Sequence, residues 1–148
     1  MSATGPLLDS VALLGGGALA GPDEVEQIPA EAGAYALFLR LDARLRFERR
    51  ALAGVLEPGW YAYAGSAKGP GGMRARLARH MRAGKAVRWH VDEVSNAAAE
   101  VAALAIPGGS ECAIVDALLG SGRFSVPIPG FGSSDCRHCA AHLLAYKE

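Results

Sequence analysis

Tyrosine, arginine and histidine side chains follow one another closely over residues 61–80, in an order that could act on a phosphate group. Tyr63 ends an aromatic run, a glycine-rich turn follows, and Arg76 and His80 come four positions apart in the next segment. The planar guanidinium group of an arginine binds two phosphate oxygens together, which the point charge of a lysine does not. A tyrosine whose pKa is lowered by a neighbouring arginine or metal ion can remove a proton from water. This combination favours a site that holds a phosphodiester.

The tyrosines, and a glutamate further along the chain, also have ordinary structural interpretations. Tyr35 and Tyr61 are aromatic residues of the kind that pack in β-sheets. Glu111 stands at the expected start of a helix, where a carboxylate interacts favourably with the helix dipole. The residues alone leave both interpretations open.

Positive charge is concentrated in the same stretch, although the formal net charge of the 148-residue chain is zero. No Asp or Glu occurs between Pro58 and Val91, whereas residues 1–31 carry acidic side chains and no Lys or Arg. An unopposed basic surface is typical of proteins that contact a polyanion, and a solvated helix face is the alternative. The basic residues predicted to contact nucleic acid are Lys68, Arg74, Arg79, Arg82, Lys85 and Arg88.

Two predicted strands would carry the tyrosines. Residues 33–41 and 60–64 have strand composition, and alternation with a period of two puts Tyr61 and Tyr63 on one face. The same alternation predicts one face of the first strand, formed by Tyr35, Leu37, Leu39 and Leu41.

A helix predicted over residues 73–83 would carry the basic side chains. At 100° per residue its buried stripe consists of Met73, Leu77 and Met81. Arg76 and His80 flank that stripe on one side and would line a cleft. The remaining arginines of the helix, Arg79 and Arg82, would point largely toward solvent.

The remaining segments fit one small domain of mixed α/β or α+β class. Residues 1–27 form an acidic, Gly- and Ala-rich lead-in, and residues 28–148 form the domain. Its other expected elements are a second strand or projecting hairpin at 44–54, a short strand or helix entry at 87–92, a helix at 111–119, a loop at 128–136 and a final strand or short helix at 139–146.

A small cluster of possible metal ligands lies near the C-terminal end. Cys136 and Cys139 form a C-x-x-C pair, and His142 follows three residues later. Together with Cys112 they could form a closed zinc site with three cysteines and one histidine. A redox pair and buried thiols without a metal are the alternatives.

Three cysteines in 148 residues do not make the disulfide framework of a small secreted protein. No apolar run approaches the roughly 20 residues that span a bilayer, and the N-terminus lacks the basic region of a signal peptide. We therefore expect a cytoplasmic protein without a membrane partner.

Two triplets resemble the motifs that name the GIY-YIG nuclease superfamily: Gly33-Ala-Tyr35 in the first strand and Tyr63-Ala-Gly65 in the second. Ser66 and the segment Arg76-Leu-Ala-Arg-His80 extend the match. The best match looks like an uncharacterised branch of that superfamily, some of whose members are fused to endonuclease III. Patterns similar to those of that branch bring the resemblance to residues 28–146, namely Trp89-His90, Glu111-Cys112, residues 130–136 and His142-Leu143.

The resemblance implies a central antiparallel sheet of about three strands flanked by helices, and phosphodiester hydrolysis with one divalent metal ion, Mg²⁺ or Mn²⁺. It implies that Tyr35 and Tyr63 lie beside the attacking water, one of them as general base. Arg76 would stabilise the charge of the transition state. Glu111 would hold the metal, and His80 would assist proton transfer or orientation.

The chain departs from the superfamily pattern in three places. Alanine stands where each triplet of the motif name has isoleucine. The spacing from Tyr35 to Tyr63 is longer than usual, which predicts an inserted hairpin around residues 44–55. The segment from Gly65 to Arg76 is also long, and this leaves Arg74 as a rival for the catalytic arginine.

These observations predict a nucleic-acid-binding protein that acts as a metal-dependent endonuclease, with DNA favoured over RNA as its partner. The fusions suggest a DNA-repair protein as a further partner. A catalytically silent nucleic-acid-binding module and a zinc-stabilised interaction module are the alternatives, and the oligomeric state stays open.

Overall fold

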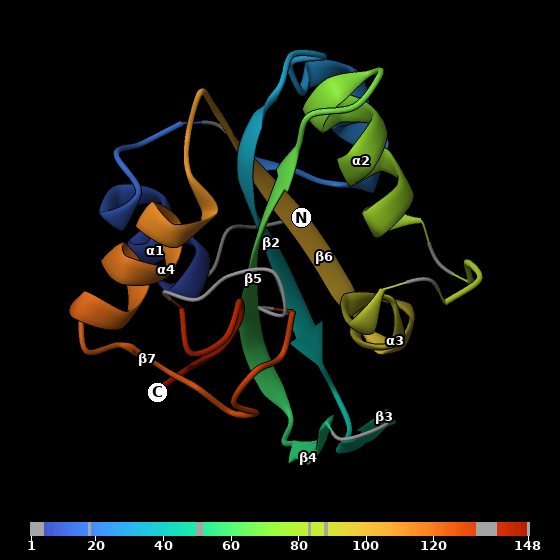
Figure 1. Ribbon diagram of the computed structural model, residues 1–148, viewed down its shortest axis with the longest axis vertical. Coiled ribbons are helices and arrows are strands. Elements are labelled where there is room, and N and C mark those ends of the chain that lie inside the picture. Colours follow the sequence, from blue (N-terminus) through green and yellow to red (C-terminus); the bar gives the residue numbers. More distant parts are fainter. Residues whose placement is uncertain are drawn as a thin grey trace.

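The computed structural model describes residues 5–17, 19–49, 52–82, 84–87, 89–132 and 139–147. Its centre is a six-stranded antiparallel sheet with the strand order β1-β6-β2-β5-β8-β7, and β3 and β4 form a separate two-stranded sheet (Figure 1). The strands are β1 (Leu19–Ala20), β2 (Gly33–Leu41), β3 (Leu45–Arg49), β4 (Leu52–Leu56), β5 (Gly59–Ala67), β6 (Glu100–Pro107), β7 (Phe124–Ser125) and β8 (Leu143–Tyr146). The helices are α1 (Gly5–Leu13), η1 (Pro22–Gln27, a 3₁₀ helix), α2 (Gly72–Met81), α3 (His90–Ala97) and α4 (Glu111–Gly120).

The α+β class is confirmed, but the expectation of about three strands is wrong. β6 comes from an alanine-rich segment without the β-branched alternation that marks a strand, and it pairs with β2 along most of its length. β1 and β7 have two residues each, too few to show a period.

Both faces of the sheet are buried, with α1 and α4 on one side and α2 and α3 on the other (Figure 1). The face predicted for β2 is confirmed, since Tyr35 and the three leucines that alternate with it lie in the core beneath α2 and α3. The predicted stripe of α2 lies in the same core, with Met73, Leu77 and Met81 all buried. The intervening residues of β2 form a second core with Leu7 of α1 and Ile114 of α4.

The bounds of α2 differ little from the predicted ones, and α2 packs closely on β2. α2 ends at Met81 rather than at residue 83. A Cβ on Gly33 would lie 2.8 Å from the Met73 sulfur, so the first glycine of the resemblance lets the helix pack closely on β2. The predicted hairpin at 44–54 is confirmed as β3 and β4, and α3 begins at His90, within the segment for which a helix entry was one of the two expectations.

The described part of the N-terminal lead-in belongs to the fold. Leu7 is completely buried. β1 pairs with β6 at one edge of the sheet through Leu19↔Leu104 and Ala20↔Ala103. The acidic, Gly- and Ala-rich composition did not predict this packing, which depends on apolar residues such as Leu7.

Candidate functional site

The register of β2 and β5 places the two predicted tyrosines. Tyr35 of β2 lies directly opposite Gly65 of β5. A Cβ on residue 65 would come within 2.5 Å of the Tyr35 hydroxyl oxygen, so a glycine is needed for the ring to lie across the neighbouring strand. The spacing Tyr-x-Gly therefore positions one tyrosine on β5 and leaves room for the other from β2.

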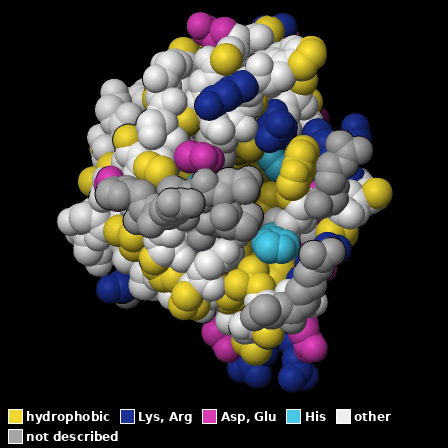
Figure 2. Space-filling view, in the orientation of Figure 1, with side chains coloured by type: hydrophobic (Ala, Val, Ile, Leu, Met, Phe, Trp, Pro, Cys, Tyr) yellow, Lys and Arg dark blue, Asp and Glu magenta, His cyan; other side chains and the backbone are white. Residues whose placement is uncertain are grey.

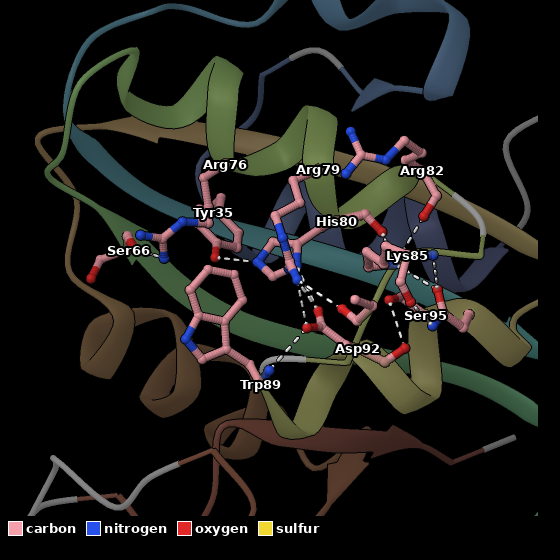
Figure 3. Close-up of polar contacts among 12 residues, drawn as sticks. Tyr35, Ser66, Arg76, Arg79, His80, Arg82, Lys85, Trp89, Asp92 and Ser95 are labelled. Atoms are coloured by element: carbon pink, nitrogen blue, oxygen red, sulfur yellow. Dashed lines mark hydrogen bonds and ion pairs between the residues drawn. The ribbon is translucent and has the colours of Figure 1, made fainter.

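His80 of α2 meets Tyr35 inside the protein. The Tyr35 hydroxyl and His80 Nε2 are 2.9 Å apart, and both side chains are buried (Figure 3). The ring of Tyr63 lies 6.3 Å from that of His80, in an edge-on arrangement. Tyr63 is only half-buried, so it lies nearer to solvent than Tyr35.

Asp92 lies behind this pair, on the first turn of α3. Its carboxylate accepts N–H bonds from Arg79 at 3.0 and 2.9 Å and from the Trp89 backbone at 2.9 Å. Asp92 Oδ1 lies 3.8 Å from His80 Nδ1, and the Asp92 side chain is fully buried. The sequence predicted Arg79 to point to solvent, which is wrong because the buried carboxylate holds its guanidinium group.

Arg76 occupies the predicted side of α2. It is half-buried, its Nη1 donates to the Ser66 carbonyl at 3.2 Å, and its guanidinium carbon lies 4.7 Å from the centre of the Trp89 ring. Figure 3 shows Arg76 reaching from the helix toward Ser66 and the indole. The rival Arg74 turns away, because its guanidinium donates to the carbonyls of Ile28 and Glu26 beside η1.

Glu111 approaches from the other side of β5. The Ala64 amide donates to the His142 carbonyl at 2.9 Å, and His142 Nδ1 lies 3.8 Å from Glu111 Oε2. The Glu111 side chain keeps 34% of its exposure. Its negative charge raises the pKa of Tyr63 and of Tyr35, so the carboxylate acts electrostatically on both phenols.

Arg76 alone does not lower the pKa of either tyrosine below its ordinary value. Burial, followed by the charge of Glu111, raises the pKa of Tyr63 to about 12. Burial also raises the pKa of Tyr35, and Arg76 opposes both shifts without reversing them. Removing a phenol from water disfavours its anion more than one half-buried guanidinium group favours it.

Burial has the opposite effect on His80. It lowers the pKa of the ring to about 4, and the Arg76 and Arg79 charges contribute to the lowering while Asp92 opposes it. His80 is therefore neutral at physiological pH and can accept a hydrogen bond.

The predicted nucleic-acid-binding residues differ in their surroundings. Arg79, as described above, is bound to Asp92. Lys68, Arg74 and Arg82 are exposed, and Figure 2 shows Lys and Arg side chains gathered over the region of α2 around a hollow with a histidine in it. Lys85 is only 7% exposed and donates to the His80 and Arg82 carbonyls at 3.0 Å each. The expectation that Lys85 faces a polyanion is therefore wrong, because its ammonium group ends α2 instead. Arg88 lies outside the described residues.

Three of the four predicted zinc ligands come together. One ligand atom from each of Cys112, Cys139 and His142 lies within 4.8 Å of the others. His142 is 3% exposed, and its Nε2 is buried with no hydrogen-bond partner among the described residues. A buried, unsatisfied ring nitrogen beside two thiols fits a transition-metal ion. The fourth predicted ligand, Cys136, lies outside the described residues.

Sequence reasoning missed Asp92. An acidic residue three positions after a helix start is the ordinary sign of an N-terminal cap, and Asp92 does accept the Trp89 amide. Only the fold shows that the same carboxylate also lies beside His80.

One cavity of the molecule offers no group for catalysis or metal binding. A cavity of about 200 Å³ lies between β6 and η1, and no titratable side chain lines it. No helix in the described part of the chain combines the length and apolarity needed to cross a membrane.

Comparison with known proteins places most of the chain in one family. Residues 34–148 match the family described as Domain of unknown function DUF123. No curated protein and no solved structure matches the chain.

Proposed function

The chain belongs to the DUF123 family, and because that description assigns no activity, we propose from the site itself that the protein is a metal-dependent endonuclease of the GIY-YIG type. The observation that carries the proposal is the convergence of Tyr35, Tyr63, Arg76, His80 and Glu111 around one stretch of β5. Packing alone needs no guanidinium group and carboxylate beside two phenols.

The accessible members of the group suit the work of binding a phosphodiester. Arg76 would bind phosphate oxygens and stabilise the additional charge of the transition state. It is held by the Ser66 carbonyl and by the Trp89 ring, so its position costs little further ordering when substrate binds. The half-buried Tyr63 would contact the attacking water.

A divalent ion fits Glu111. Mg²⁺ and Mn²⁺ prefer oxygen ligands, and Mg²⁺ needs only one or two protein carboxylates because it keeps most of its waters. Glu111 offers a partly exposed carboxylate whose charge acts on both tyrosines. A bound Mg²⁺ would neutralise phosphate charge and lower the pKa of its own water.

Nucleic acid, with DNA favoured, is the proposed partner. The exposed Lys68 lies in the turn before α2 and the exposed Arg82 lies at the C-terminal cap of α2, so they could follow a phosphate backbone on both sides of Arg76. The proposal of a DNA-repair partner rests on the resemblance alone.

Cleavage of labelled DNA in Mg²⁺ or Mn²⁺ tests the proposal, with Arg76→Ala and Glu111→Ala as the site variants. We expect both to lower cleavage by about 10²-fold or more, while DNA affinity changes little, because each group acts mainly in the transition state. Arg74→Ala is the matched control. It removes an arginine from the same helix, but the Arg74 guanidinium group contacts η1 and its end rather than the site.

Three outcomes separate the candidate functions. Cleavage that survives both site variants would mean that another site is responsible. Binding without cleavage by the unmodified chain would indicate a silent nucleic-acid-binding module. Neither binding nor cleavage would leave the zinc-stabilised interaction module.

We also propose that Cys112, Cys139 and His142 hold a zinc ion. Thiolate and imidazole ligands suit zinc, and Glu111 beside His142 Nδ1 could orient the ring. Elemental analysis of the purified chain should find about one zinc per chain. A strong chelator should lower the melting temperature of the unmodified chain but not that of Cys112→Ser with Cys139→Ser. Metal-free protein that melts unchanged would contradict the proposal.

A further inference from the structure

We propose that Asp92 is a positioning residue, which holds the proton of the neutral His80 ring on Nδ1 so that Nε2 accepts the hydroxyl hydrogen of Tyr35. This assignment concerns the resting protein and can be tested without any activity. Only its consequence for hydrolysis rests on the proposed function.

The surroundings of His80 Nδ1 carry the first step. This atom is buried and has no hydrogen-bond partner among the described residues. The nearest charged acceptor is Asp92 Oδ1 at 3.8 Å, which is longer than a hydrogen bond but within the range of a charge contact. On its other side the ring bonds to Tyr35 through Nε2 at 2.9 Å.

The two neutral tautomers differ sharply in this setting. With the proton on Nδ1, an N–H dipole points toward the buried carboxylate, and a small movement would complete a hydrogen bond. With the proton on Nε2, a nitrogen lone pair faces the carboxylate with no donor between them, in a region of low dielectric where this repulsion is strong. The geometry therefore favours Nδ1–H.

Asp92 is held firmly enough to impose this choice. Arg79 donates hydrogen bonds to both carboxylate oxygens, and the Trp89 amide donates to one of them. The guanidinium carbon of Arg79 also lies 4.5 Å from the centre of the Trp89 ring. Figure 3 shows this group as a continuous set of contacts from α2 to the first turn of α3. Arg79 also neutralises the carboxylate, which helps to keep His80 uncharged.

The assignment fixes the direction of the Tyr35 hydrogen bond. The phenol donates to His80, so its oxygen lone pairs are left to accept from the substrate side. A proton that reaches the Tyr35 oxygen from that side can be balanced by transfer of the phenol proton to His80 Nε2. The imidazolium ion that results faces Asp92, and after the reaction its Nε2 proton returns to the Tyr35 oxygen, which releases its other proton on the substrate side. Tyr35 then passes a proton on without becoming an anion.

The test is the ring nitrogen signals of His80 in ¹⁵N-histidine-labelled protein at neutral pH. The chain has four histidines, and the His80→Gln variant identifies the signals of His80. We expect a protonated Nδ1 and an unprotonated Nε2. In Asp92→Asn the side-chain amide can donate to Nδ1, so we expect the proton to move to Nε2. Asp9→Asn is the matched control, because Asp9 also pairs with an arginine, Arg123, at 2.7 Å but far from the site.

Two results would overturn the assignment even if Asp92→Asn fails to fold. One is a proton on Nε2 in the unmodified chain. The other is a change of tautomer in Tyr35→Phe, which would make Tyr35 the residue that decides it. If the chain cleaves DNA, Asp92→Asn should lower kcat by about 10²–10⁴-fold with DNA affinity unchanged. If the proton moves to Nε2 in Asp92→Asn as expected but the unmodified chain cleaves no DNA, the proposed function is contradicted and the tautomer assignment stands.

Discussion

Burial and charge compete at each titratable side chain of the candidate site. For Tyr35, Tyr63 and His80, burial is the largest influence and favours the neutral form in every case. The resting site thus consists of neutral phenols and a neutral imidazole, between one guanidinium group and one carboxylate. Proton movement in such a site proceeds by exchange between neutral partners more readily than through a stable tyrosinate.

The lowered pKa of His80 predicts a specific loss of stability in mild acid. The ring titrates at about 6.5 when unfolded and at about 4 when folded, so the unfolded chain binds more protons between these values. The stability that the neutral His80 ring contributes is therefore fully present above the unfolded pKa, and it is lost as the pH drops toward the folded pKa. Between pH 7.5 and 5 we expect a loss of about 2 kcal/mol, because one pKa unit corresponds to about 1.4 kcal/mol.

Urea unfolding at the two pH values measures this loss, and His80→Gln should reduce it strongly. Titration of other groups is common to both proteins and cancels in the comparison. An equal loss in both would show that His80 does not carry the effect.

The residue-level predictions from the sequence succeeded where position on an element determines the surroundings. Met73, Leu77 and Met81 are buried because a helix must bury its apolar stripe, and Arg76 follows from the same geometry. The partner of Arg79 could not be predicted in this way. That partner is the carboxylate of Asp92 in α3, and only the packing of α2 against α3 shows that this cap residue also faces His80.

At the scale of elements, the end of α2 distinguishes a lysine and an arginine that look equivalent in the sequence. Lys85 closes the helix by donating to its last carbonyls and to Asn96 Oδ1 at 3.1 Å. Arg82 is exposed to solvent. The first is therefore a structural cation, and the second is available to a phosphate backbone.

Substitution of the two residues should separate these roles. Lys85→Met should lower the free energy of unfolding by about 1–3 kcal/mol, because it leaves buried carbonyl groups unsatisfied. Arg82→Gln should leave stability unchanged and reduce the slope of log affinity for DNA against log salt by about 0.9. Denaturant unfolding and salt titrations provide the measurements. A reduced slope in Lys85→Met with unchanged stability would return Lys85 to the binding surface.

Elements with a clear period were predicted well from the sequence, and elements without one were not. β2 and α4 agree with the strand and helix expected at 33–41 and 111–119, and β5 contains the strand expected at 60–64 but continues to Ala67. β6 was missed because its alanines fit a helix or a strand equally, and its pairing with β2 decides between them. The separate hairpin of β3 and β4 was expected from the long spacing between the tyrosines.

At the scale of the whole molecule, the candidate site is built from both sides of a three-layer fold. Tyr35 and His80 lie on the side of α2 and α3, whereas Glu111 belongs to α4 on the opposite side. They meet where β8 begins, because Leu143 pairs with Tyr63 of β5, and His142, immediately before β8, accepts the Ala64 amide. Sequence patterns predict the separate layers, but this meeting depends on where β8 begins beside β5.

The strand order also determines when the site can form during synthesis. β5 lies between β2, which is made before it, and β8, which is made more than seventy residues later. While the ribosome is still adding residues 68–141, one edge of β5 is unpaired and the carbonyl that receives the Ala64 amide does not yet exist. A nascent chain therefore presents an open strand edge to chaperones, and Glu111 gains its neighbour His142 only after residue 142 has been added.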